Sequence, residues 1–309
     1  MREGPSHNCS VASGSTPSAK VTCEFTPPAR RSFEWKGKRP GAKFQRPVAS
    51  QTLIPPFEEL SCVECQSGAG LDFEFTMAFQ PFVEAGTARI FGYEALVRGI
   101  NGESAFEILG RVNDSNRYRF DQACRVKAIQ LASELNLTGM LSINFLPNAI
   151  YRPESCIRTT LKAAEKAGFA HERLMFEVTE GERVKDHAHL RTIFTEYKRQ
   201  GFKTAIDDFG AGYAGLNMLA AFQPDFIKLD MELTRNVDKD VVRQAIVAGI
   251  TETCRALKLG IIAEGIETRG EYEFLASKGI RLFQGYFFAR PGFRSLPPIS
   301  EAGLQALRG

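Results

Sequence analysis

Carboxylate, amide and ammonium side chains recur close to the ends of short apolar runs in this 309-residue chain. In sequence order they are Glu94, Asn144, Glu177, Glu180, Asp207, Asp208, Lys228, Asp230, Glu264 and Gln284. The carboxyl ends of parallel strands converge on one face of an α/β barrel, so these side chains would share one bowl although they are far apart in sequence.

Several ionised carboxylates in one bowl require cations, because like charges a few ångströms apart repel strongly. The candidate ligands are all oxygen donors, which favours hard ions such as Mg²⁺ or Mn²⁺ over zinc. Two such ions roughly 3.5–4 Å apart activate a water and stabilise in-line displacement at phosphorus. Lys228 can orient that water or neutralise developing charge, and the fork of Arg98 suits a phosphate. The residues predict metal-dependent hydrolysis of a phosphate ester.

Eight short apolar runs are predicted strands, at about 74–81, 89–97, 140–146, 173–179, 202–208, 225–230, 260–264 and 280–284. Segments of helical period lie between them, including 117–136, 187–199 and 240–258. Alternating strands and helices predict a parallel sheet, and a count of eight favours closure into a barrel. An open doubly wound sheet is the alternative, but no GxGxxG turn follows the first strand.

The first 56 residues differ in composition from the rest of the chain. They hold nine Lys and Arg against three acids, and eight of the fifteen prolines. Such a segment cannot bury enough apolar surface to offset its ordering entropy, which predicts a disordered basic arm. The predicted division is an arm and connector over 1–71 and a folded domain over 72–309. A solvated tail is favoured over contact with nucleic acid or anionic lipid, so no stable partner of either kind is expected.

Cysteine usage and hydropathy indicate a reducing, cytoplasmic setting. The seven cysteines are an odd set without framework spacing. Cys62 and Cys65 have the spacing of half a metal or redox site, but no second pair follows at a zinc-ribbon distance. No run of 18 apolar residues and no signal-peptide core is present in the sequence.

The candidate residues fall in a series of short motifs, which are YEALVR at 93–98, SIN at 142–144, FEVTE at 176–180, DDFG at 207–210, KLD at 228–230, AEGIE at 263–267 and QGY at 284–286. In order and spacing this series resembles the EAL-domain cyclic di-GMP phosphodiesterases, from about residue 73 to 291. The resemblance implies a modified TIM (β/α)8 barrel that hydrolyses cyclic di-GMP to linear pGpG with Mg²⁺ or Mn²⁺. No GGDEF signature of diguanylate cyclases is present.

The resemblance also implies roles for individual residues. Glu94, Asn144, Glu177 and Asp207 would bind one metal ion, and Asp207 with Asp208 the second. Lys228 would hold the attacking water, and Glu264 would act as general base or as a water-mediated metal partner. The residues expected near the dinucleotide are Gln80, Leu96, Arg98, Asp230, Glu267 and Gln284.

The resemblance further implies a homodimer. Glu180 would steady the loop 208–213, which in this family couples dimerisation to metal and substrate binding. Family members commonly dimerise through the helix that follows this loop. Here Tyr213-Ala214-Gly215-Leu216 stands where many relatives read Tyr-Ser-Ser-Leu, and we expect this change to alter loop dynamics rather than chemistry.

Two other functions remain open from the sequence. The first is a degenerate barrel that binds cyclic di-GMP or a partner protein without turnover. Degenerate members usually lack a metal carboxylate or the lysine, and this chain retains both, which favours an active enzyme. The second, more distant alternative is a nucleic-acid regulator that acts through the basic arm.

Overall fold

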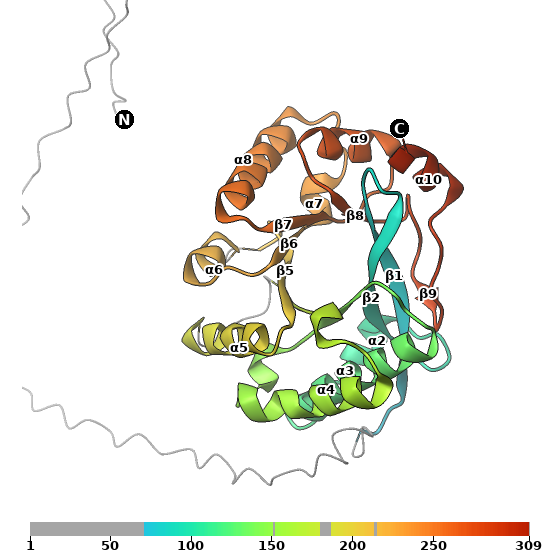
Figure 1. Ribbon diagram of the computed structural model, residues 1–309, viewed down its shortest axis with the longest axis vertical. Helices are drawn as coiled ribbons and strands as arrows, with labels where there is room; N and C mark the ends of the chain where they lie inside the picture. The colour runs from blue at the N-terminus through green and yellow to red at the C-terminus, as the bar shows by residue number, and fades with distance from the viewer. Residues whose placement is uncertain (1–70, 151, 180–186, 213–214, 309) are drawn as a thin grey trace, which may run out of the picture. The chain divides into compact units, whose positions relative to one another are not determined.

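The computed structural model describes residues 71–308 apart from 151, 180–186 and 213–214. The strands of this part of the chain are β1 (Phe75–Glu84), β2 (Arg89–Gly99), β3 (Met140–Asn144), β4 (Leu174–Thr179), β5 (Lys203–Phe209), β6 (Phe226–Leu229), β7 (Gly260–Ala263), β8 (Leu282–Gln284) and β9 (Gly292–Phe293). β1 to β8 pair in order, and β1 closes the ring by pairing with both β2 and β8 (Figure 1). The predicted eight-stranded barrel is confirmed.

One strand differs from the expected all-parallel sheet. β1 runs antiparallel to β2 and to β8, whereas β2 to β8 are parallel to one another. Only four residues, 85–88, join β1 to β2, and a parallel connection needs a dozen or more. The expected strict alternation of strand and helix was therefore wrong at this step. The hairpin pairs Gln80 with Glu94.

Helices surround the barrel on its outer side (Figure 1). They are α2 (Ala105–Leu109), α3 (Arg117–Glu134), α4 (Pro153–Ala167), α5 (His187–Arg199), α6 (Gly215–Ala221), α7 (Met231–Thr234), α8 (Val241–Leu257), α9 (Arg269–Ser277) and α10 (Glu301–Arg308), with 3-10 turns η1 (Pro147–Ala149) and η2 (His171–Arg173). The helices predicted over 117–136, 187–199 and 240–258 correspond to α3, α5 and α8. Among the described residues, no helix combines the length and the apolar character that a membrane crossing requires.

The interior of the barrel is filled at its floor by apolar side chains. Phe82, Met175, Ala205, Ile262 and Leu282 form one buried cluster there. Four of them stand two residues from a polar candidate on the same strand, and Ile262 stands two residues before Glu264, which directly follows β7. Residues two apart on a strand point to the same face. The polar layer therefore rests directly on this apolar floor, which supports it from below.

Gly92 is a position on the floor where a side chain has no room. It pairs with Phe82 across the hairpin, two residues before Glu94. A Cβ at Gly92 would lie 2.4 Å from the ring of Phe82 and 2.6 Å from the carbonyl oxygen of Met140. Glycine at this position lets the Phe82 ring fill the barrel.

We expect Gly92→Ala to lower the free energy of unfolding by about 1–3 kcal/mol, because the added methyl must displace the Phe82 ring or the backbone. Urea denaturation would measure the change. Gly249→Ala is the matched control, since nothing lies within 4 Å of a Cβ on that helical residue. The control should gain up to about 1 kcal/mol from helix propensity, and an equal loss in both variants would contradict the close packing.

Candidate active site

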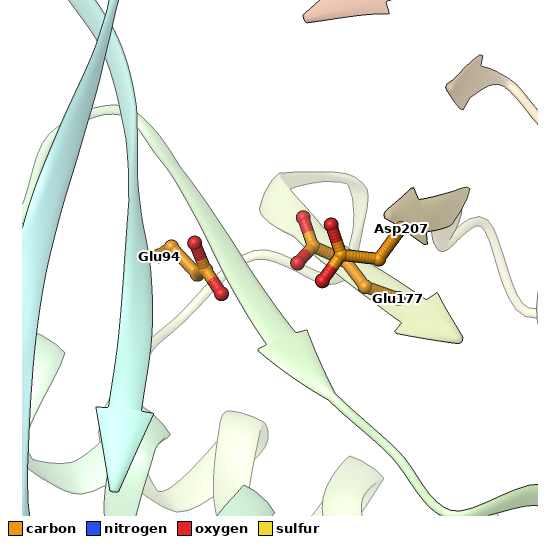
Figure 2. Close-up of side chains that lie close together, drawn as sticks. All are labelled: Glu94, Glu177 and Asp207. Atoms are coloured by element: carbon orange, nitrogen blue, oxygen red, sulfur yellow. The ribbon is translucent and has the colours of Figure 1, made fainter. Parts of the chain in front are cut away.

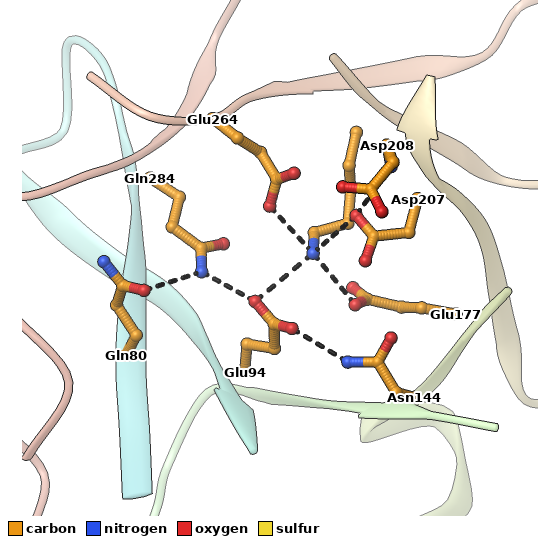
Figure 3. Close-up of polar contacts among 9 residues, drawn as sticks. Gln80, Glu94, Asn144, Glu177, Asp207, Asp208, Glu264 and Gln284 are labelled. Carbon is orange, nitrogen blue, oxygen red and sulfur yellow. Dashed lines mark hydrogen bonds and ion pairs between the residues drawn. The ribbon is translucent and has the colours of Figure 1, made fainter. Parts of the chain in front are cut away.

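Lys228 on β6 lies at the centre of the polar layer and is 1% exposed. Its Nζ atom is 2.8 Å from Glu264, 2.9 Å from Glu177, 3.0 Å from Asp207 and 3.2 Å from Glu94. Figure 3 shows these carboxylates, from different strands and strand ends, turned toward one point. The structure thus brings together the charged side chains that the sequence predicted to share one bowl.

Two groups of carboxylates are close enough to hold a cation. Glu94, Glu177 and Asp207 offer oxygens within 4.8 Å of one another (Figure 2), and so do Asp207, Asp208 and Glu264. Asp207 belongs to both groups. This arrangement fits two neighbouring cations that share Asp207. The second group also contains Glu264, which the resemblance implied as a general base or water-mediated partner and not as a direct ligand.

The amide side chains of Asn144 and Gln284 hold the carboxylate of Glu94 in place beside Lys228. Asn144 donates to its Oε1 at 2.9 Å and Gln284 to its Oε2 at 2.7 Å (Figure 3). Gln284 also donates to Gln80 at 3.4 Å, and Gln80 donates to the carbonyl oxygen of Ala289 at 3.2 Å. Glu94 was expected near the end of its strand, but it lies in the middle of β2, because the hairpin with β1 extends that strand to Gly99.

Burial changes the ionisation of this cluster in the absence of an ion. Burial, with Glu94 and Asp207 adding to it, raises the pKa of Glu177 to about 8 against the lowering effect of Lys228. Burial and the adjacent Asp207 raise the pKa of Asp208 to about 6. Burial is also the main cause that places the pKa of Glu264 well above its ordinary value. Burial alone would lower the pKa of Lys228, but the carboxylates raise it well above the usual range.

Two further observations fit a cation at this cluster. Among the described residues, the buried Oε1 of Glu177 has no hydrogen-bond partner, and an unpaired buried carboxylate oxygen is costly without a cation or donor. Asp208 has a φ of +53°, a left-handed conformation that aspartate adopts more readily than most residues. This backbone conformation sets the direction of the Asp208 side chain beside Asp207.

A cavity of about 380 Å³ opens beside the acidic cluster. Of the predicted substrate residues, it is lined by Gln80, Leu96, Asp230, Glu267 and Gln284. Arg98 is not among its lining residues and donates instead to the carbonyl oxygen of Val97 at 2.7 Å. Glu180 lies outside the described residues, as do the predicted arm, Cys62 and Cys65.

Four lining residues were not predicted as site residues. Met231, Gly265, Gly285 and Tyr286 also line the cavity. The guanidinium of Arg290 lies 4.1 Å from the centre of the Tyr286 ring, and this ring is about half exposed. The signal was present for three of them, since Gly265, Gly285 and Tyr286 belong to the quoted motifs, whereas Met231 is distinguished only by its place after Asp230.

A family model described as the EAL domain matches residues 69–291 of the chain. The chain belongs to the EAL domain family. The predicted resemblance is therefore confirmed, and the acidic cluster is the part of the EAL barrel where the motif residues converge.

Solved EAL structures share the fold. A standalone versatile EAL protein from Vibrio cholerae O395, solved in a c-di-GMP-bound form, is 57% identical; the match covers 75% of this chain and 98% of that chain, with a TM-score of 0.73. Klebsiella pneumoniae BlrP1, solved at pH 9.0 as a manganese and cy-diGMP complex, is 38% identical over 74% of this chain and 58% of that chain, with a TM-score of 0.70.

The curated relatives include proteins named as phosphodiesterases and one named as an antirepressor. The blue light- and temperature-regulated antirepressor BluF of Escherichia coli K12 is 34% identical over 72% of this chain and 56% of BluF. Other relatives are named cyclic di-GMP phosphodiesterases. The chain spans between 21% and 56% of the length of the first curated relatives that it matches.

We expect Mn²⁺ to raise the melting temperature, because an ion that binds the folded state alone stabilises it, by about 2.7 kcal/mol at a concentration 100 times its dissociation constant. Asp207→Asn should abolish the increase, since Asp207 contributes to both acidic groups. Differential scanning calorimetry with and without EDTA would measure it. Asp114→Asn, an exposed carboxylate elsewhere, is the control and should keep the full response.

The raised pKa of Glu177 predicts a pH dependence of the metal-free protein. The folded state binds this proton more tightly than the unfolded state, so the free energy of unfolding should fall as pH rises from about 5 to about 8. Glu177→Gln cannot ionise and should flatten this fall. Urea denaturation in EDTA across this pH range would test it, with exposed Glu252→Gln as the control; parallel curves for wild type and Glu177→Gln would contradict the shift.

Proposed function

We propose that this EAL domain is a metal-dependent phosphodiesterase that hydrolyses cyclic di-GMP to linear pGpG. The observation that carries the proposal is the pair of carboxylate groups that share Asp207, with the buried ammonium of Lys228 among them. Two cations held by oxygen ligands can stabilise the attacking and leaving oxygens of an in-line displacement at phosphorus, and a nearby cationic side chain can stabilise the charge that develops there. Support also comes from relatives named cyclic di-GMP phosphodiesterases and from structures solved with this dinucleotide.

Glu94, Asn144, Glu177 and Asp207 would hold one Mg²⁺ or Mn²⁺, and Asp207 with Asp208 the other. When bound, the two ions lower the pKa of a water and polarise the phosphate. Lys228 is placed to hold that water by a hydrogen bond, and Glu264, 2.8 Å from Lys228, to accept its proton. The water oxygen forms the new P–O bond, the P–O3′ bond breaks, and a proton returns to O3′.

The cavity beside the cluster is suited to a guanine base. Asp230 and Glu267 offer carboxylates that can accept hydrogen bonds from the N1–H and 2-amino groups of guanine. Leu96 and the half-exposed Tyr286 offer apolar and aromatic surface. Arg98 would have to leave the Val97 carbonyl to reach a phosphate.

We also propose the domain division and assembly expected from the sequence, with an arm over 1–71, a catalytic domain over 72–309, and a homodimer in the cytoplasm. The homodimer is supported by apolar side chains that stay exposed on α6 and α8, namely Leu216, Val241, Val242 and Ile246. Leu216 on α6 and Ile246 on α8 line one hollow together, and a contiguous exposed apolar surface marks an interaction site.

A receptor without turnover is the second candidate function, because one relative is named an antirepressor. It would use the same cavity and bind the dinucleotide intact. The two candidates differ in the fate of the ligand.

Incubation of the purified chain with cyclic di-GMP and Mn²⁺, followed by chromatography, would test the enzyme. We expect pGpG to accumulate, and we expect Glu94→Ala and Lys228→Ala to lower the rate by about 100-fold or more, since each removes charge stabilisation at the reacting phosphate. Glu252→Ala, an exposed residue on α8, should retain the wild-type rate. Bound but intact cyclic di-GMP would establish the receptor instead.

A further inference from the structure

Three polar side chains are buried on α3, outside the barrel wall, and none of them lines the cavity of about 380 Å³. Asp121, Gln122 and Arg125 are 2%, 0% and 0% exposed. The proposed chemistry uses none of them. A buried ion pair adds little net stability compared with apolar residues of similar volume, so their contacts need another explanation.

The contacts of these side chains join helices α3 and α5 to the segment that follows β3, the strand that carries the predicted metal ligand Asn144. Asp121 forms an ion pair with the Nη2 of Arg125 at 2.7 Å, and the Nη1 of Arg125 donates to the hydroxyl of Tyr197 on α5 at 2.7 Å. The other oxygen of Asp121 accepts the backbone N–H of Leu146 at 2.8 Å. Leu146 is two residues after Asn144, so the network fixes the backbone at the end of β3.

The guanidinium of Arg125 also packs against the outer side of β3 and β4, next to the predicted metal ligands on these strands. Its Cζ atom lies 5.6 Å from the ring of Phe145 and 5.2 Å from the ring of Phe176. Phe145 follows Asn144, and Phe176 precedes Glu177. Because neighbouring residues on a strand point to opposite faces, these rings face the guanidinium on the outside of the barrel while Asn144 and Glu177 face the acidic cluster.

The two strand ends are coupled at the same point. The N–H of Phe145 donates to the carbonyl oxygen of Glu177 at 3.0 Å, and Asn144 pairs with Glu177 in the parallel ladder. A displacement of the backbone at Asn144 would therefore also displace the backbone at Glu177. The position of Arg125 behind both rings restrains them together.

A second cavity lies beside this segment. It measures about 430 Å³, and Asn144, Leu146 and Asp121 line it together with Glu94 and Asp207. The hydrogen bond from the backbone of Leu146 to Asp121 therefore forms part of the wall of this cavity and ties the segment after β3 to α3.

We infer that Asp121, Arg125 and Tyr197 are positioning residues that orient Asn144 and Glu177 for a divalent cation. The inference rests on the proposed function in so far as that ion is the cofactor. Loss of residues that hold metal ligands in place typically weakens metal binding by about 10–100-fold. The network acts on the ligands through the backbone of β3 and β4 and touches neither ion nor substrate.

The test is the dissociation constant of Mn²⁺, measured from the electron paramagnetic resonance signal of the free ion. Tyr197→Phe removes one hydrogen bond, and Arg125→Lys keeps the charge but loses the fork. Tyr272→Phe is the matched control, because it deletes the same hydroxyl from a buried tyrosine that packs against Phe283 and Phe288. We expect binding about 10-fold weaker or more in the first two variants and unchanged in the control.

Equal Mn²⁺ dissociation constants for Tyr197→Phe and Tyr272→Phe, at temperatures where both are folded, would overturn the inference. If Arg125→Lys does not fold, the tyrosine pair alone decides. Hydrolysis is followed separately in the wild type, so Mn²⁺ binding without turnover would refute the proposed function and leave the affinity comparison valid. A wild type that binds no Mn²⁺ would overturn both.

Discussion

The organisation of this barrel depends on one constraint, which is that four carboxylates can share a buried space only when cations offset their charge. Lys228 supplies one positive charge at distances of 2.8–3.2 Å from all four. Without an ion, the raised pKa values of Glu177 and Glu264 favour protonation, which would relieve part of the remaining negative charge. The same imbalance gives the cluster its capacity for divalent ions, which would displace those protons.

The barrel meets this constraint through strand periodicity. Gln80, Glu177, Asp207, Glu264 and Gln284 each stand two positions from an apolar residue of the floor, so the same strand face supplies both layers. The floor packs tightly enough that Gly92 admits no side chain. The polar side chains therefore have no space to move toward the apolar floor, and the backbone sets the distances between the carboxylates. Rigid support of this kind keeps a cation site ready before its ligand arrives.

Much of this arrangement could be predicted from sequence, because the polar residues near strand ends are separated by apolar runs of strand length. The convergence of Glu94, Glu177, Asp207, Lys228 and Glu264 follows from that pattern and an eight-stranded count. The antiparallel β1 could have been inferred from the four-residue connection, but the alternation of the other elements obscured it. The orientation of Arg98 toward Val97 and the contact of Asp121 with Leu146 depend on tertiary packing, which no local pattern encodes.

The reversed direction of β1 also determines from which side the polypeptide enters the barrel. Phe75 pairs with Gly99 at the carboxyl end of β2, so the first strand starts on the rim that carries the acidic bowl. In an all-parallel barrel the first strand would start beneath the floor, a full strand length from the chemistry. The described backbone that leads into Phe75 therefore reaches the barrel from the side of the acidic cluster, and not from the side of the apolar floor.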